Sequence, residues 1–186
     1  SPCIADIKVC TNHYSPKYSK EKILRLKARD LNSTSGKYGI RIADVLVRKN
    51  REVFKHYTRK QGKVMKIEEV KGAIDDFLYT IPLKRAFAKE IQKMINCLEA
   101  TLRENPYFRL FQSSVLTVYD SDLVDENGEI PEGTMRVKLI DLAYLYPDIR
   151  DETDEEIKAG ILHGCKTLLS IVNEQINEQT GEYAQR

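Results

Sequence analysis

The sequence predicts an α+β protein, with one antiparallel sheet and with helices that occupy separate stretches of the chain. Two observations support this class. Segments with strand character follow one another in pairs, at 38–57 and 108–141, as expected of hairpins. Helical periodicity is confined to other segments, at 15–31, 67–104 and 155–178.

The composition is that of a globular protein, with 41% hydrophobic and 31% charged residues among 186. No stretch reaches the ~18 apolar residues of a membrane-spanning helix, and no apolar segment opens the chain, so we expect neither a membrane span nor a secretory signal. The four cysteines form no CxxC pair, which argues against a zinc ribbon and a disulfide scaffold. We therefore expect a reducing, intracellular location. Because the first residue is not Met, we expect the natural chain to begin earlier.

The net charge of +2 conceals two halves of opposite sign. Residues 1–93 carry a net charge of +12, and residues 94–186 carry −10. A basic half fits an anionic partner such as nucleic acid, an anionic lipid or a polyphosphorylated small molecule, and carboxylates of the acidic half could bind a divalent metal. Two solvated surfaces of opposite charge explain the same numbers, so the alternatives stay open at this point.

The chain begins with a predicted strand that carries two charged residues. Residues 2–10 are rich in β-branched side chains, which favours a mostly buried strand. Asp6 and Lys8 lie two positions apart and therefore point to the same side of it. They are either ion-paired there or part of a site.

A basic helix follows over 15–31, with Ser19 as its expected N-cap. Lys22, Arg25 and Arg29 fall on one face of this helix. Because like charges repel, we expect this unpaired stripe to be stabilised by an anion bound against it. A solvated helix face is the alternative.

The middle of the chain predicts a hairpin and two amphipathic helices. The expected elements are a loop at 32–37, strands at 38–49 and 51–57, and helices at 67–79 and 83–104. Residues 48–71 contain nine Lys or Arg against three Glu. Few aromatic side chains interleave with these cations, so we do not expect nucleic-acid binding through this segment.

The last part predicts a second hairpin and a final helix. The expected elements are strands at 108–120 and 134–141, an acidic loop at 121–133 between them, a loop at 144–153 and a helix at 155–178. Asn127-Gly128 is a strong turn signal within the acidic loop.

The residues on these strands suit phosphoryl transfer. Asp141 ends a hydrophobic strand, where a carboxylate can hold Mg²⁺. With Asp6 and Lys8 it provides a metal ligand, a group that orients an acceptor hydroxyl, and a cation for the migrating phosphoryl group. The chain contains neither a P-loop motif nor GxGxxG. The three histidines are isolated and are expected to be surface or packing residues: His13, His56 and His163.

Four motifs resemble those of the inositol polyphosphate kinases and occur in the order of that family. PCIADIKVC at 2–10 is similar to the signature PxxxDxKxG, and SSVL at 113–116 is similar to SSLL. LIDLA at 139–143 resembles IDFA, and GILHG at 160–164 has the spacing of GYxxG.

Within this family the sequence is most similar to the inositol hexakisphosphate kinases. Ser33–Ser35, followed by Gly39, resembles their STSxxxGVRV segment, and Lys22 with Arg25 matches their SxEKxxR helix. The polyphosphate multikinases share the DxK strand and the EK helix but are less similar at Ser33–Ser35.

The resemblance implies that residues 1–186 form a protein-kinase-like large lobe, the C-terminal lobe of the family's fold, without its N-terminal lobe. It implies a substrate-binding helical segment at 17–31 and a short acidic loop at 121–133. It also implies ATP- and Mg²⁺-dependent phosphorylation of an inositol polyphosphate, with inositol hexakisphosphate converted to a diphosphoinositol pentakisphosphate, in the cytoplasm or nucleus. A multikinase for lower inositol phosphates and a non-catalytic inositol-polyphosphate-binding module are the alternatives. The sequence does not indicate the oligomeric state.

The resemblance also implies residue roles. Lys8 contacts the transferred phosphoryl group, Asp6 lies at the acceptor, and Ser114 lines the cleft near the metal. Asp141 binds the Mg²⁺ of ATP. The helix stripe clamps the substrate phosphates: Lys22, Arg25 and Arg29.

Three residues depart from the family pattern. Cys10 replaces the final Gly of PxxxDxKxG, which would hinder the backbone if it needs a positive φ there. Leu142 replaces a Phe, and Tyr144 stands where the family usually has a His, which removes one possible substrate contact.

Overall fold

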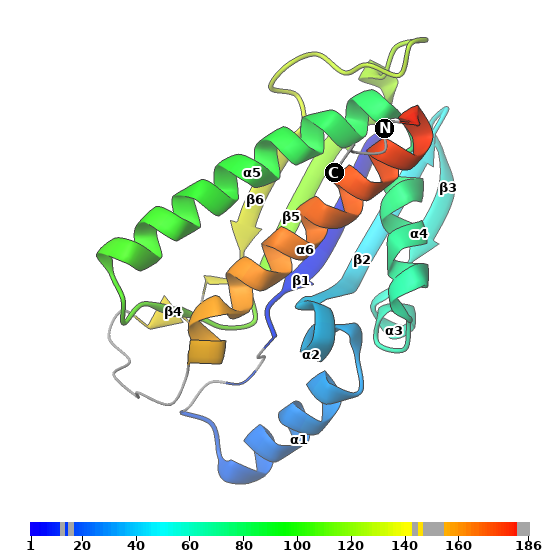
Figure 1. Ribbon diagram of the computed structural model, residues 1–186. Coiled ribbons are helices and arrows are strands. Elements are labelled where there is room, and N and C mark those ends of the chain that lie inside the picture. The colour runs from blue at the N-terminus through cyan, green and yellow to red at the C-terminus, as the bar shows by residue number, and fades with distance from the viewer. Residues whose placement is uncertain (12–13, 15–16, 143–144, 147–154, 182–186) are drawn as a thin grey trace.

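A five-stranded antiparallel sheet forms the centre of the fold, with strand order β3-β2-β1-β5-β6 (Figure 1). The computed structural model describes residues 1–11, 14, 17–142, 145–146 and 155–181, with the backbone alone for 145–146 and 155–159. The strands of the sheet are β1 (Pro2–Val9), β2 (Ile40–Lys49), β3 (Glu52–Tyr57), β5 (Ser114–Asp120) and β6 (Arg136–Ile140). Both predicted hairpins are present, as β2–β3 and β5–β6, and the α+β class is confirmed.

Three helices cover one face of this sheet (Figure 1). They are α4 (Ile67–Phe77), α5 (Ile81–Glu104) and α6 (Glu155–Thr180). The predicted apolar stripe of α5 is buried at Phe87, Ile91 and Ile95, because these side chains pack in the core between helices and sheet. On β1, Cys3, Ala5, Ile7 and Val9 face this core, and the residues between them face the opposite side. No helix in the described part of the chain has the length and apolar character needed to cross a bilayer.

A β-bulge in β2 sets which of its side chains reach the open face of the sheet. β1 pairs Asp6 with Asp44 but Ile7 with Ile42, so Ala43 is an extra residue. Before the bulge, Arg41 lies opposite Lys8 on the open face; after it, Val45 points into the core. A regular strand would have placed residues 41 and 45 on the same face, because side chains alternate with period two.

The structure differs from the sequence prediction at two connections. The predicted loop at 32–37 contains a short helix, α2 (Thr34–Tyr38), which ends at Gly39 with φ 67°. A residue without Cβ adopts this left-handed conformation at little cost, so the glycine terminates the helix.

The strand predicted at 108–120 is two strands. Gln112 has φ 61°, which breaks the extended backbone. The part before it, β4 (Arg109–Leu110), pairs with β7 (Leu145–Tyr146) in a separate two-stranded sheet. Residues 147–153 of the predicted loop at 144–153 lie outside the described residues.

Two further connections carry short helices. The helix α3 (Arg59–Gly62) follows β3 and packs against β2, and the acidic loop at 121–133 begins with a short 3₁₀ helix, η1 (Ser121–Leu123). Neither was predicted, because one turn of helix has too few residues to display a periodicity.

The basic helix α1 (Lys20–Leu31) lies beyond the end of the sheet, next to α2 (Figure 1). Its predicted N-cap is confirmed, since the Ser19 hydroxyl accepts a hydrogen bond from the Lys22 amide at 3.3 Å. The rest of the predicted span, at 15–19, is not helical where the structure describes it.

Two glycines let α6 approach the end of β1. A Cβ atom at Gly160 would lie 2.6 Å from the Thr11 hydroxyl. A Cβ atom at Gly164 would meet the carbonyl oxygen of Gly39 and the Cα of Val9, the latter at 3.1 Å. The spacing GILHG therefore reflects close packing: residues four apart share a helix face, and here that face touches backbone.

We predict that Gly164→Ala lowers the free energy of unfolding by about 1–3 kcal/mol, because the added methyl group overpacks a site bounded by backbone. Gly72→Ala in α4 is the matched control, since a Cβ atom there has nothing within 4 Å. The control should raise the free energy of unfolding by about 0.5–1 kcal/mol through helix propensity. Urea denaturation measures both, and equal stability of the two variants would contradict the proposed packing.

Candidate active site

The amino group of Lys8 is the centre of a polar site on the open face of the sheet. Lys8 Nζ donates a hydrogen bond to the carbonyl oxygen of Gln112 at 3.0 Å and forms an ion pair with the carboxylate of Asp141. It does not pair with Asp6, the residue two positions before it on the same face. Lys8 thus joins β1, the turn before β5 and the end of β6.

A cavity of about 390 Å³ lies beside this amino group. The lining residues come from four strands or their ends and from α3: Asp6, Lys8, Arg41, Ala43, Arg59, Gln112 and Asp141. Three cations against two carboxylates leave the lining with an excess positive charge. A cavity of this kind favours an anion with several charges, and the two carboxylates favour a cation bound with it.

Arg41 is the most deeply buried cation of the site, with 3% of its surface exposed. Its Nε atom has no hydrogen-bond partner among the described residues. Burial lowers the pKa of Arg41, the positive charges of Arg29 and Arg59 lower it further, and Asp30 and Asp6 act in the opposite direction. A buried, incompletely paired guanidinium is costly, so this arrangement is favourable when an anion occupies the cavity.

The carboxylates of the cavity suit a hard metal ion that is shared with phosphates. Asp6 Oδ1 is buried and accepts no hydrogen bond from the described residues, and Asp141 is about half exposed. No group of three or more His, Cys, Asp or Glu side chains in the described part of the chain could hold a metal. Mg²⁺ commonly needs only one or two carboxylates together with substrate phosphates, so the oxygen atoms present fit this ion.

The backbone is strained at the two residues that hold the Lys8 amino group. Gln112 and Asp141 have φ values of 61° and 62°, in the left-handed region that residues other than glycine rarely adopt. Each contributes one of the two acceptors of the Lys8 amino group. Such conformations cost about 1–3 kcal/mol each and cluster where an active site requires a fixed geometry.

Ser114 is beside Lys8 but does not line the cavity. The two residues are partners in the β1–β5 register, so their side chains point to the same face. Ser114 is fully buried, and its hydroxyl has no hydrogen-bond partner among the described residues. On its other side Ser114 pairs with Ile140 of β6, and a role of Ser114 at the cleft near the metal stays a prediction.

The basic stripe of α1 differs from the unpaired stripe that we expected. Arg29 forms an ion pair with the buried Asp30 at 2.8 Å, and the ammonium of Lys22 lies 3.3 Å from the ring centre of Tyr18. Arg25 is exposed. The positive charge of Arg29 lowers the pKa of Arg41, so the end of α1 lies close enough to the cavity to influence its electrostatics.

The departures from the family motifs fall into three cases. Cys10 does not have a positive φ, and its side chain is buried in the core, so the backbone there accommodates a side chain. Leu142 is 47% exposed and does not pack in the hydrophobic core. Tyr144 lies outside the described residues.

Sequence reasoning missed Arg41, Arg59 and Gln112. Arg41 had a usable signal, since a lone arginine in an apolar strand must find a partner or a site. Gln112 had none, because it contributes a backbone carbonyl. Arg59 was one of many cations in the basic segment at 48–71, and only the packing of α3 against β2 distinguishes it.

Comparisons with known proteins show the family of the chain and agree with its fold. The sequence model described as inositol polyphosphate kinase matches residues 1–173. The chain is 32% identical over 149 residues to the inositol polyphosphate multikinase of Schizosaccharomyces pombe, covering 77% of this chain and 54% of that protein. It is 24% identical over 212 residues to inositol hexakisphosphate kinase 2 of Homo sapiens, covering 97% of this chain and 50% of that protein.

The fold is that of solved inositol phosphate multikinases. The crystal structure of Ipk2 from S. cerevisiae in complex with ADP and Mn²⁺ superimposes with a TM-score of 0.72 at 23% identity, covering 94% of this chain and 78% of that one. The α+β architecture thus belongs to a class of mixed, kinase-like folds. The chain is a member of the inositol polyphosphate kinase family. It spans about half the length of the curated relatives named above.

We predict that Arg41→Met raises the free energy of unfolding of the ligand-free protein by about 1–2 kcal/mol, because it removes a buried and incompletely paired charge. The same variant should be stabilised less by added tripolyphosphate. Arg25→Met, at an exposed position of α1, should change stability by no more than about 0.5 kcal/mol. Denaturation with and without the anion measures these effects. Lower stability of the ligand-free Arg41→Met protein would contradict the prediction, because Arg41 would then stabilise the ligand-free fold.

Proposed function

We propose that this chain is the catalytic large lobe of an ATP-dependent inositol polyphosphate kinase, and that residues 1–186 act as one such unit. The proposed reaction transfers a phosphoryl group from ATP to inositol hexakisphosphate, which gives a diphosphoinositol pentakisphosphate. The observation that carries this proposal is the convergence of Lys8, Arg41 and Arg59 on one cavity that also contains two carboxylates. Membership of the family supports it.

Lys8 is the proposed contact for the transferred phosphoryl group. Its ammonium is held by Gln112 and Asp141, so little reorganisation is needed when negative charge develops near it. Arg41 and Arg59 are proposed to bind other substrate phosphates, since guanidinium groups match phosphate oxygens in geometry and charge. The stripe on α1 remains a proposed part of this clamp, with Arg25 its most exposed member and Arg29 partly neutralised by Asp30.

Asp141 and Asp6 are the residues that would hold Mg²⁺. The ion would arrive with ATP and would neutralise charge on the phosphates when bound. Asp6 is proposed to hold the metal or the structure of the site rather than to remove a proton, because inositol hexakisphosphate has no free hydroxyl. Ser114 keeps only an indirect role in this proposal, through the packing of β1 against β5.

The second candidate is a multikinase that phosphorylates lower inositol phosphates. The relative with 32% identity is a multikinase, and so is the solved structure with TM-score 0.72. The two candidates differ in acceptor, a phosphate oxygen in one and a hydroxyl oxygen in the other. A non-catalytic module would bind the same ligands without transfer. A cytoplasmic or nuclear location stays a prediction.

We predict that Lys8→Met lowers the rate of phosphoryl transfer by about 100-fold or more, because the variant lacks the cation at the reacting phosphate. Phosphorus NMR of the natural-length protein with Mg-ATP and inositol hexakisphosphate measures the product through its new β-phosphate signals. Lys93→Met, on the exposed side of α5, is the control and should retain activity. The Lys8–Asp141 pair is partly exposed, so the fold of the variant should be stable within about 1 kcal/mol.

Three other outcomes separate the alternatives. Hydroxyl phosphorylation of inositol tris- or tetrakisphosphate, without any pyrophosphate product, would identify a multikinase. Saturable binding without transfer would identify a binding module. Normal transfer by Lys8→Met would contradict the role proposed for Lys8.

We predict that Asp6→Asn lowers pyrophosphate synthesis and hydroxyl phosphorylation by a similar factor, because a residue that holds the metal or the structure of the site serves both acceptors. A hydroxyl acceptor benefits from a carboxylate that orients it or takes its proton, whereas a phosphate oxygen is already ionised. The ratio of the two rates, measured by the same NMR assay, tests this. Loss of hydroxyl phosphorylation alone, with pyrophosphate synthesis retained, would instead assign Asp6 to the orientation or deprotonation of a hydroxyl acceptor.

A further inference from the structure

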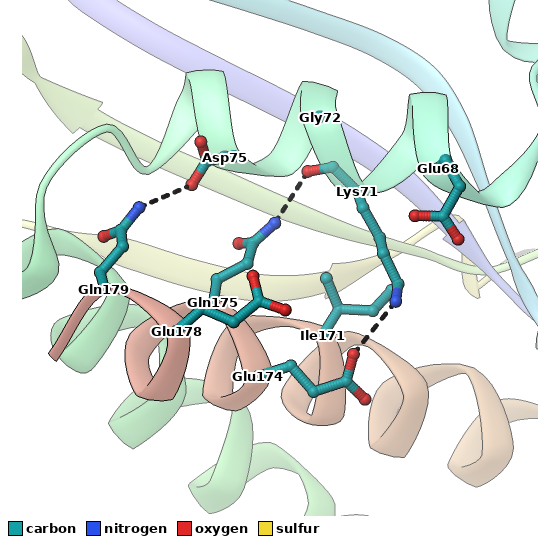
Figure 2. A pocket seen from close by; sticks show the side chains of 9 residues that line it. All are labelled: Glu68, Lys71, Gly72, Asp75, Ile171, Glu174, Gln175, Glu178 and Gln179. Carbon is teal, nitrogen blue, oxygen red and sulfur yellow. Dashed lines mark hydrogen bonds and ion pairs between the residues drawn. The ribbon is translucent and has the colours of Figure 1, made fainter. Parts of the chain in front are cut away.

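A second polar cavity lies on the helical side of the molecule, in the groove between α4 and α6 (Figure 2). Its volume is about 260 Å³. The charged and amide side chains that line it come from both helices and include Glu68, Lys71, Asp75, Glu174, Gln175 and Glu178. It shares no lining residue with the cavity at Lys8.

The groove has more carboxylates than cations. Lys71 Nζ pairs with Glu174 at 3.1 Å. The fully buried Lys84, which does not line the groove itself, pairs with Asp75 at 2.9 Å. The remaining two carboxylates of the groove, Glu68 and Glu178, have no ion-pair partner among the described residues.

The potential in the groove favours a further cation. The hydrogen bond with Glu174 raises the pKa of Lys71, and the negative charges of Glu174, Glu68 and Glu178 raise it as well. Lys71 alone therefore does not neutralise the carboxylates around it. The excess negative charge of the groove is two.

Gln175 provides a second and independent indication of a ligand. This residue is buried, with 9% of its surface exposed, and its side chain projects from α6 between the two helices (Figure 2). Its amide nitrogen donates to the Lys71 carbonyl oxygen at 2.9 Å. That oxygen can only accept, so the orientation of the amide is determined and Oε1 is left as an acceptor. Oε1 has no hydrogen-bond partner among the described residues.

The arrangement of these acceptors fits an extended organic cation better than a metal ion. No three carboxylates in the described residues are close enough to coordinate one metal. The acceptors are instead spread along the groove, from Glu68 near one end to Asp75 near the other (Figure 2). Gly72 and Ile171 provide apolar surface between them, and Gly72 leaves open space at the wall.

We propose that the groove between α4 and α6 binds a linear aliphatic polyamine, with ammonium groups at Gln175 Oε1 and at the carboxylates of Glu68 and Glu178. The methylene segments of such a molecule pack against Gly72 and Ile171. Each ammonium donates charge-assisted hydrogen bonds, and the buried amide oxygen gains the partner that it lacks. This site is independent of the proposed kinase reaction, because it lies on the other side of the sheet.

Titration calorimetry with spermidine, at physiological ionic strength, tests the proposal on the whole chain. Screening by salt suppresses binding that depends on net charge alone. We expect saturable binding of one spermidine per chain. Gln175→Met, which removes the acceptor at similar volume, should weaken it by about tenfold.

A double variant provides a second test that does not touch the buried amide. Glu68→Gln with Glu178→Gln should weaken spermidine binding by about tenfold or more. Glu126→Gln with Glu129→Gln removes the same charge from the exposed acidic loop and should leave the affinity unchanged. This test remains decisive if Gln175→Met fails to fold.

Four results would overturn the proposal. Equal weakening by the two double variants would show that the binding is a net-charge effect. Displacement of spermidine by an equal concentration of Mg²⁺ would indicate a metal site. Binding of a lysine-rich peptide but not of spermidine would indicate a protein partner. The absence of saturable spermidine binding would leave the groove without the assigned ligand.

Discussion

The pairing of β1, the central strand of the sheet, positions both the hydrophobic core and the candidate site. This strand pairs with β2 on one side and with β5 on the other, so both neighbours take their register from it. One face of β1 supplies the core, and the other presents Asp6 and Lys8 to the open side of the sheet. Because side chains alternate, a slip of one residue in this strand would bury both charged groups and expose the core. Core and site are therefore specified together.

Much of the fold follows from local sequence patterns. The hairpins, the capped basic helix and the amphipathic helices agree with the sequence because periodicity and turn residues are local signals. Two of the connections that differ from the prediction depend on single backbone conformations. Gly39 and Gln112 adopt positive φ, and each redirects the chain in a way that composition does not encode.

The candidate site was predictable only in part. Lys8 and Asp141 could be proposed as a pair of functional residues, and the structure brings them into contact. The place of Arg41 depends on the bulge at Ala43, which inverts the strand's alternation and has no sequence signal of its own. The pairing of Arg29 with Asp30 also depends on packing, because a buried carboxylate needs a cation beside it and only the folded structure shows that Asp30 is buried.

The two cavities lie on opposite sides of the sheet, and their linings carry net charges of opposite sign. The cavity at Lys8 has an excess of cations, and the groove between α4 and α6 has an excess of carboxylates. In both, a buried polar group has no partner in the described residues: Arg41 Nε in the first and Gln175 Oε1 in the second. Both residues line a cavity, so a ligand bound there is in a position to supply the partner.

Nitrogen NMR of the arginine side chains, recorded during titration with inositol hexakisphosphate, tests directly whether the cavity at Lys8 binds the polyphosphate. If the cavity at Lys8 binds the polyphosphate, the Arg41 Nε–H signal should shift and its exchange with water should slow as the ligand saturates, because a phosphate oxygen then accepts its hydrogen bond. If the ligand shifts only Arg25 and Arg29 and leaves Arg41 unchanged, polyphosphate binds along α1, and the account of the cavity is contradicted.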